Sequence, residues 1–446
     1  MSASDRQRLI EEMLARYRQI LERRLPRGPQ KIDQIEPTVE EISQELEREL
    51  EQRILHEQKS PPDNRAGCPR CDASARFRGW EARCVLTRHG ERRLNRRYYY
   101  CSACQQGFAP LDLALGLDRS SLTAQVRLQL AHLAAWQPFA EAVVTLQLLT
   151  GLPVSAKSVE RAAVSVGQLL GEGQREAAAQ HRHGRLPQPT ARPRQLYVSM
   201  DGVFVPLRDP WKRDGSLGKL ACRFGECKVG AVYEVRPGAE GNLHAHRPVY
   251  TATFDGVEAF GPLIATLAHQ QGHHFAREVI VLGDGAAWIW RVAAAQFPGA
   301  IQIIDYCHAC QHLWKVAEAG FGGRNAAAKA WVEERKRELL ADDVGRVLSA
   351  IAAWEPKNDE GEKLKQTEGA YFAGNAERMR YGTFRKKGYQ IASGVIESAC
   401  KHVVGSRLDQ AGMHWRQETA EAIVRLRAAV RSTPATDLRP YCGMAA

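Results

Sequence analysis

Two closely spaced pairs of cysteines form the clearest chemical motif in the sequence. Cys68-Pro-Arg-Cys71 and Cys101-Ser-Ala-Cys104 are C-x2-C knuckles, and two knuckles can supply the four thiolates of a tetrahedral zinc site. The spacer is longer than in the commonest pattern, but its segments FRGWEARCVLT and RRLNRRYYY read as a β-hairpin. Four thiolates leave no open position, so we expect a zinc ribbon over residues 65–110 that holds one structural Zn²⁺.

Three carboxylates could support a second kind of metal chemistry. Asp201 follows the apolar run LYVSM, Asp284 follows EVIVLG, and Glu397 stands in the helix-like stretch SGVIESACK. Sites in α/β sheets gather where strands end, although a single aspartate there equally often caps a turn. Each aspartate is followed by glycine, which allows close approach. Oxygen ligands of this kind suit Mg²⁺ or Mn²⁺, and about two such ions can stabilise the attacking and leaving oxygens of a phosphodiester.

Other residues compete for these roles. Asp305 also ends a strand-like run, IQIID, but Asp284 lies on the earlier strand and is preferred. His308 and His312 share a helix face and, with no third ligand evident, are expected to pack or to contact DNA. Cys307-His-Ala-Cys310 opens a helix after a strand, as in thioredoxin-like redox proteins. The surrounding domain is far too large for that class, so phosphoryl transfer is the stronger prediction.

The positive charge of the chain indicates a polyanionic partner. The formal net charge is +11, and residues 65–108 hold ten arginines against three acidic residues. Arginine clusters of this kind suit phosphates. The predicted DNA-contacting residues of the hairpin, which precede three tyrosines, are Arg92, Arg93, Arg96 and Arg97.

Basic and aromatic residues also follow Glu397. Lys401 and Arg407 are expected to hold phosphates of the scissile strand through charge-assisted hydrogen bonds. Trp415, in GMHW, could stack on an unpaired base or pack in the core.

The pattern of elements predicts a multidomain α+β protein. Amphipathic helices occupy residues 1–57, the second opening with a Thr38-x-x-Glu41 capping box, and serve packing or oligomerisation. Residues 119–175 are helical, with a TGLPV turn and a Ser155 cap that outline a helix-turn-helix. The remaining predicted segments are a linker (181–194), an α/β domain (195–319), a helical insertion (320–385) and a closing helical part (386–433).

The bulk composition is that of a soluble protein. Of 446 residues, 44% are hydrophobic and 25% charged, and no apolar run reaches membrane-spanning length. Met1 is followed by no apolar signal core, and the clustered cysteines suit a reducing compartment. We therefore expect a cytoplasmic protein that is not associated with a membrane.

Five blocks of sequence resemble the ISKra-type family of bacterial insertion-sequence transposases. In order they are MDGVFV, VLGDGAAWIW, IIDYCHACQHLWK, SGVIESACK and SRLDQAGMHW. The resemblance covers about residues 195–430, and less sharply the zinc ribbon and the helices after it. It implies the DDE group, with a ribonuclease H-like catalytic domain, a helical insertion and a catalytic set of Asp201, Asp284 and Glu397.

The combined prediction is a transposase that binds insertion-sequence ends and performs Mg²⁺-dependent strand cleavage and strand transfer. Its partners would be double-stranded DNA and further copies of the chain. Two other classes remain open: a ribonuclease H-like nuclease or resolvase that cuts without joining, and a catalytically inactive zinc-ribbon DNA-binding regulator. All three bind DNA, and only the first two need the carboxylates.

Overall fold

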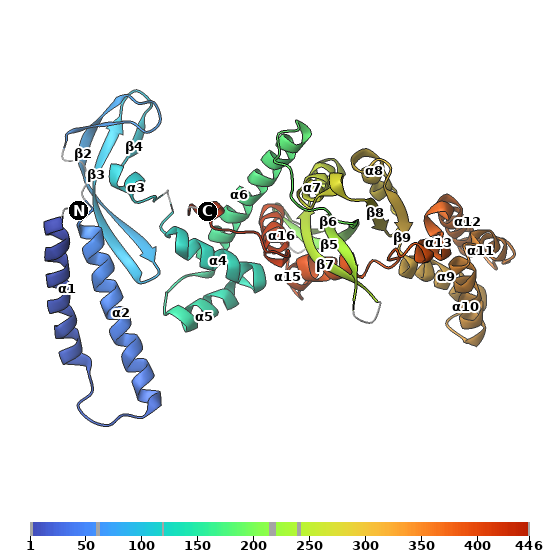
Figure 1. Ribbon diagram of the computed structural model, residues 1–446, viewed down its shortest axis with the longest axis horizontal. Coiled ribbons are helices and arrows are strands. Elements are labelled where there is room, and N and C mark those ends of the chain that lie inside the picture. Colours follow the sequence, from blue (N-terminus) through green and yellow to red (C-terminus); the bar gives the residue numbers. More distant parts are fainter. Residues whose placement is uncertain (1–2, 59–62, 118–119, 214–219, 239–241, 445–446) are drawn as a thin grey trace. The chain divides into compact units, whose positions relative to one another are not determined.

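The chain consists of two compact units. The computed structural model describes residues 3–58, 63–117, 120–213, 220–238 and 242–444 (Figure 1). The first unit comprises Met1–Leu133, Phe139–Ala162 and Leu438–Ala446. The second comprises Ala134–Pro138 and Ala163–Asp437.

The first unit begins with two paired helices, α1 (Ala3–Arg24) and α2 (Ile32–His56). Ion pairs such as Arg16–Glu49, at 3.2 Å, connect them. Helix α2 begins six residues before the predicted Thr38, because the Gln34 side chain accepts the Lys31 backbone N–H and forms the cap there. The Thr38 hydroxyl lies inside the helix and donates to the Gln34 carbonyl.

An antiparallel sheet follows and contains the predicted hairpin. Strands β2 (Ser74–Thr87) and β3 (Gly90–Cys101) pair along their length, with β1 (Arg65–Gly67) and β4 (Gln106–Phe108) outside them. The small core of this sheet contains the fully buried Tyr99, whose hydroxyl donates to the Asp63 carbonyl. This core places the two cysteine knuckles at one end of the hairpin.

Four helices follow the sheet: α3 (Pro110–Ala114), α4 (Ala124–Trp136), α5 (Phe139–Thr150) and α6 (Ala156–Arg182). Ser155 Oγ accepts the Ser158 N–H at 3.1 Å and caps α6 as predicted. Helix α6 runs for 27 residues and includes the first two residues of the predicted linker. Its apolar residues continue past residue 175, as shown by the buried Ala178, so nothing ends the helix there.

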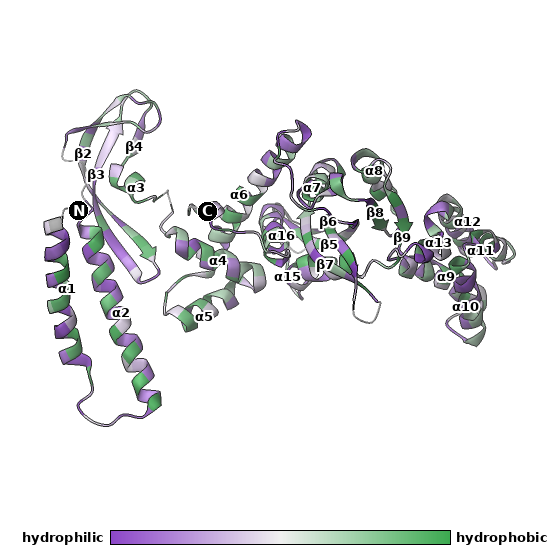
Figure 2. Cartoon of the chain, in the orientation of Figure 1, coloured by the Kyte–Doolittle hydropathy of each residue, from purple (hydrophilic) through white to green (hydrophobic). Residues whose placement is uncertain are grey.

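The second unit is built on a mixed five-stranded sheet. Its strands are β5 (Gln195–Arg213), β6 (Leu220–Pro237), β7 (Leu243–Thr253), β8 (Glu278–Gly283) and β9 (Ile301–Ile304). The order is β7-β6-β5-β8-β9, with antiparallel pairing from β5 to β7 and parallel pairing from β5 through β8 to β9. Figure 2 shows β8 and β9 as strongly hydrophobic, as expected for strands covered on both faces. The predicted mixed α/β architecture is confirmed.

Helices cover both faces of this sheet. On one face, Val198 and Met200 pack against Phe260 of α7 (Gly256–Gln270) and Ile289 of α8 (Ala287–Gln296). The opposite face packs against α14 (Gly394–Ala399) and α16 (Gln417–Arg431). The other elements of this unit outside residues 320–385 are η1 (His273–Phe275), α9 (Tyr306–Phe321), a π-helical turn η3 (Cys400–Gly405) and α15 (Ser406–Leu408). The short helix η4 (Pro440–Cys442) belongs to the first unit.

The segment predicted as a helical insertion is helical in the structure. It contains α10 (Ala326–Leu340), α11 (Val344–Ala352), α12 (Asp359–Gly374), η2 (Ala376–Met379) and α13 (Tyr381–Lys386). Among the helices of the described residues, none has both the length and the apolar character needed to cross a bilayer.

Candidate metal centres and nucleic-acid interface

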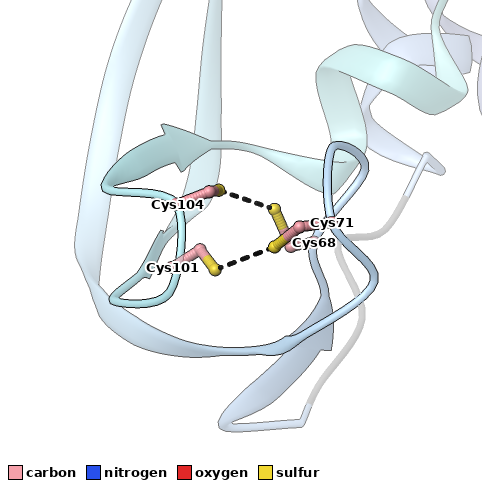
Figure 3. Close-up of side chains that lie close together, drawn as sticks. All are labelled: Cys68, Cys71, Cys101 and Cys104. Atoms are coloured by element: carbon pink, nitrogen blue, oxygen red, sulfur yellow. Dashed lines mark hydrogen bonds between the residues drawn. The ribbon is translucent and has the colours of Figure 1, made fainter.

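The four knuckle cysteines lie together at the end of the hairpin (Figure 3). The Sγ atoms of Cys68 and Cys104 are 3.5 Å apart, and those of Cys71 and Cys101 are 3.6 Å apart. A tetrahedral zinc with Zn–S bonds of about 2.3 Å requires sulfur atoms about 3.8 Å apart. The four thiols are therefore arranged so that they could hold a zinc ion, as the sequence predicted.

The backbone of each knuckle is shaped for metal binding. The residue after the second cysteine of each pair is left-handed, with φ of 59° at Asp72 and 55° at Gln105. In the first knuckle, hydrogen bonds from backbone N–H groups, chiefly that of Arg70, lower the pKa of the Cys68 thiol to about 7. This favours the thiolate, which is the form that binds metal.

Two of the four hairpin arginines predicted to contact DNA are buried, and that prediction is corrected for them. Arg92 is 7% exposed and lies 2.7 Å from a Glu51 carboxylate oxygen. Arg96 is 8% exposed and forms ion pairs with Glu81 and Asp112. Alternation along β3 turns every second side chain inward, so a run of arginines cannot all face solvent.

The other two arginines stay accessible. Arg93 is exposed, and Arg97 is half-buried, with its guanidinium 4.0 Å from the centre of the Phe77 ring. The sequence analysis missed three further exposed residues, which lie on β2: Arg76, Arg78 and Trp80. Their spacing of two residues was the signal that could have identified them.

The structure brings Asp201 and Asp284 to matching positions on neighbouring strands. The parallel pairing of β5 and β8 aligns Ser199 with Leu282, and each aspartate lies two residues further on. Asp201 does not end its strand as predicted, because β5 continues in its pairing with β6. It stands where the pairing with β8 stops, which leaves room at the sheet edge.

The two carboxylates lie on the same face of the sheet and influence each other. Burial raises the pKa of Asp201, and the negative charge of Asp284 raises it further. The Gly202 N–H donates to Asp201 Oδ1 at 2.7 Å, and the Ala286 N–H donates to Asp284 Oδ1 at 2.8 Å. These bonds fix the orientation of both carboxylates.

Side chains approach both glycines that follow the aspartates closely. A Cβ atom at Gly202 would lie 2.3 Å from a Glu226 carboxylate oxygen. Gly285 has a φ of +109°, and a Cβ atom there would lie 2.7 Å from the Tyr371 ring. The sequence predicted that these glycines allow other groups to come close to the backbone. In the structure, the groups that come close are the protein's own Glu226 and Tyr371 side chains.

Glu397 is exposed on α14, which packs on the face that carries the aspartates. Cys400, three residues later on the same side of the helix, lies with its Sγ 3.5 Å from Asp201 Oδ2. Glu397 is therefore about one helical turn from a direct contact with Asp201. Among the described residues, two groups have metal-ligand atoms that all lie within 4.8 Å of one another, and both consist of cysteines or histidines. Asp201, Asp284 and Glu397 do not form such a group in the structure.

Asp305, the competing aspartate, joins two helices. It is 3% exposed, and its Oδ1 accepts the N–H groups of Cys307 at 2.6 Å and His308 at 3.3 Å at the start of α9. Its Oδ2 accepts both the N–H and the hydroxyl of Ser393, directly before α14. Asp305 therefore positions the helix of Glu397.

The histidines predicted to share a helix face have separate partners. The contact with Asp305 raises the pKa of His308, against the effect of burial, and the charges of Asp284 and Asp201 act in the same direction. His312 Nδ1 lies 2.5 Å from a Glu368 carboxylate oxygen. The His312 ring stacks on the Tyr371 ring, with the two ring centres 3.7 Å apart. The Tyr371 hydroxyl donates to the Asp284 carbonyl at 3.0 Å, so α12 supports the second aspartate.

The cysteines of the CHAC motif lie in an environment that disfavours thiolate. Burial raises the pKa of Cys310 to about 11 and also raises that of Cys307. Redox-active cysteines of the thioredoxin type need a lowered pKa. This agrees with the preference for phosphoryl transfer.

Of the three nucleic-acid contacts predicted after Glu397, only Lys401 is exposed. Arg407 is 1% exposed, and its Nε donates to the Ala134 carbonyl at 3.1 Å. Trp415 is 7% exposed, and its Nε1 donates to the Leu408 carbonyl at 3.0 Å. The guanidinium lies 4.9 Å from the centre of the indole ring. The prediction that these two residues bind DNA is corrected, because both are core residues.

Comparison with known proteins places these sites in a family. Residues 31–439 match the family described as "Uncharacterised protein family (UPF0236)". The chain belongs to the UPF0236 family. It is also similar to "UPF0236 protein in vanSb 3'region" from Streptococcus gallolyticus, with 24% identity over 337 residues, 74% of this chain and 68% of that protein.

The UPF0236 match includes both candidate centres. Its range contains the four cysteines as well as the three carboxylates, together with most of the first unit and all of the second. The site residues of this UPF0236 chain that sequence reasoning missed are Cys400, Glu368 and Tyr371. No spacing motif marks them, because they act from helices that only folding brings to the aspartates.

Proposed function

We propose that this UPF0236 protein is a DDE transposase that binds insertion-sequence ends and catalyses DNA strand cleavage and strand transfer. The observation that carries the proposal is the register of β5 and β8, which sets Asp201 beside Asp284 on the face covered by the helix of Glu397. Three carboxylates that converge from two strands and a helix are the ligand type used in metal-dependent phosphoryl transfer.

The architecture supports a ribonuclease H-like domain. Three antiparallel strands are followed by two parallel strands reached through helices α7 and α8. Aspartates on adjacent parallel strands and a glutamate on a later helix, after a helical insertion, follow the order that the resemblance implies. This order of elements supports the three residues that the resemblance implies.

The donor set suits a divalent cation of the Mg²⁺ type. Asp201, Asp284 and Glu397 offer hard oxygen ligands, and the charge of Asp284 already disfavours ionisation of Asp201. A bound cation would neutralise that repulsion and supply Lewis-acid stabilisation for the attacking and leaving oxygens.

The protein's own groups would orient the reaction. Backbone N–H donors hold the two aspartates, and Asp305 holds the start of α14 through Ser393. Lys401, exposed on the π-helical turn that continues α14, is positioned to contact a phosphate of the scissile strand. No tyrosine or serine nucleophile is required, because water and then a freed 3′-hydroxyl attack phosphorus directly.

The first unit would bind DNA ends. The hairpin presents the exposed Arg76, Arg78 and Arg93 together with Trp80, which is 58% exposed. Basic residues interleaved with aromatic ones suit phosphate contact and base stacking. On α1 and α2, the exposed apolar residues Leu14 (65%) and Val39 (56%) would serve association with another copy on DNA.

A single assay separates the three candidate activities. A labelled duplex of the insertion-sequence end is incubated with the purified full chain, target plasmid and Mg²⁺. Joined product supports the proposal, cleavage without joining indicates a nuclease, and binding alone indicates a regulator. Glu397→Gln should abolish both cleavage and joining while DNA binding and zinc content remain, because Glu397 is exposed and its replacement leaves the core intact.

Glu418→Gln is the matched control. Like Glu397, this residue is an exposed glutamate in the first turn of a helix, here α16. It should leave joining unchanged. If Glu397→Gln joined ends as well as this control, the assignment would be wrong.

A further inference from the structure

A second cluster of metal-ligand side chains lies in the second unit, apart from the carboxylates. His181 lies in the last turn of α6, His269 lies in the last turn of α7, and His274 lies in η1. One ring nitrogen from each lies within 4.8 Å of the others. From sequence segments almost ninety residues apart, the fold thus gathers three imidazoles in one place.

The buried member of the cluster carries an unpartnered nitrogen. His269 is 3% exposed, and its Nδ1 is buried with no hydrogen-bond partner among the described residues. Its Nε2 lies 3.1 Å from the Pro187 carbonyl. A carbonyl only accepts, so Nε2 carries the proton and Nδ1 holds a lone pair. An imidazole held in this way by a backbone carbonyl is the arrangement typical of a metal ligand.

His181 is held in a comparable way. Its Nδ1 lies 3.4 Å from Thr266 Oγ1, and that hydroxyl donates to the Pro262 carbonyl at 2.7 Å. The hydroxyl proton is therefore used, so Thr266 accepts from Nδ1–H and leaves the lone pair on Nε2 of His181. Burial and the neighbouring histidines also lower the pKa values of His181 and His274.

We propose that His181, His269 and His274 form a binding site for a divalent transition-metal ion of the Zn²⁺ type. Imidazole nitrogens suit Zn²⁺ and its neighbours and not Mg²⁺. Zn–N bonds of about 2.0–2.1 Å require ligand nitrogens about 3.4 Å apart, so small side-chain rotations close the site. His181 also lines an open cavity of about 620 Å³, beside Glu258 and Arg291, which leaves space for a fourth ligand from solvent.

The site would connect α6 to the sheet domain. The Pro187 carbonyl that orients His269 belongs to the segment between α6 and β5. A metal ion held by α6, α7 and η1 would fix the path of the chain into the strand that carries Asp201. The proposal does not depend on the transposase activity.

Cobalt titration of the full-length apo-protein tests the site. In excess Mg²⁺, which occupies the carboxylates, we expect two Co²⁺ ions per chain. One should show thiolate-to-cobalt charge transfer from the cysteines, and the other only the weaker d–d bands of nitrogen ligation. Zn²⁺ should displace both.

The variant His274→Gln changes an exposed residue, so the fold should persist. It should weaken the second site by at least about 100-fold, since even outer-shell changes cost about 10–100-fold. The thiolate band should stay. His183→Gln, an exposed histidine two residues after His181, is the matched control and should bind both ions. If the unmodified protein bound no ion with the bands of nitrogen ligation, or if His274→Gln bound that ion with unchanged affinity, the proposal would be overturned.

Discussion

The role of Asp305 gives the most direct test of how the fold positions the carboxylates. The substitution Asp305→Ala removes a buried carboxylate that accepts hydrogen bonds from the start of α9 and from Ser393 before α14. Losing a helix N-cap costs about 1 kcal/mol. Each lost hydrogen bond from Ser393 to the charged carboxylate costs about 1.5–3 kcal/mol, and removing a buried charge offsets part of that. The expected net loss in the free energy of unfolding is about 3 kcal/mol.

Urea denaturation followed by tryptophan fluorescence measures this loss. Asp343→Ala is the matched control, because the Asp343 side chain caps α11 by accepting the Arg346 N–H, and its ion pair at 3.2 Å is with the side chain of that same residue. It should cost only about 1 kcal/mol. Equal losses for the two variants would refute the positioning role.

Activity separates Asp305 from the proposed catalytic aspartate. In the folded fraction, Asp305→Ala should lower strand joining because the helix of Glu397 loses its attachment. Asp284→Asn should abolish joining with little change in stability, since its side chain retains an oxygen to accept the Ala286 N–H. If Asp284→Asn lowered the free energy of unfolding more than Asp305→Ala did, Asp305 would be the better candidate for the metal ligand.

Three further predictions follow from the sites. Cys101→Ser should prevent zinc binding at the cysteine cluster. A thiol-modifying reagent should then release no zinc from the variant, as measured with a colorimetric zinc chelator. DNA cleavage by the second unit should persist if that unit stays folded. Arg407→Ala should lower the free energy of unfolding by about 2–4 kcal/mol because a fully buried side chain is lost, whereas Lys401→Ala should leave stability unchanged and weaken joining. The hydrogen bond from Tyr389 lowers the pKa of Glu278, so its stabilisation is present at neutral pH and is lost as pH falls through the lowered value. The stability difference between wild type and Glu278→Gln should therefore shrink on acidification, and a pH-independent difference would contradict this.

The sequence determined the features that depend on local spacing. The two C-x2-C pairs and the alternating hairpin predicted the cysteine cluster, because a hairpin brings its ends together whatever surrounds it. Apolar runs ending in aspartate identified β5 and β8, and the break in strand–helix alternation identified the helices of residues 320–385. The start of α2 was misplaced because two capping patterns compete within seven residues and only backbone geometry selects one.

Tertiary structure decided which side chains face solvent and which distant residues meet. The sequence does not show which arginines are buried. Arg92, Arg96 and Arg407 are buried because a carboxylate or a backbone carbonyl pairs with each guanidinium in the interior. The register of β5 and β8 set Asp201 beside Asp284, and packing brought the α14 helix to them. The three histidines of the proposed second metal site likewise meet only because folding brings the last turns of α6 and α7 together with η1. Such meetings depend on long-range packing, which no local spacing in the chain encodes.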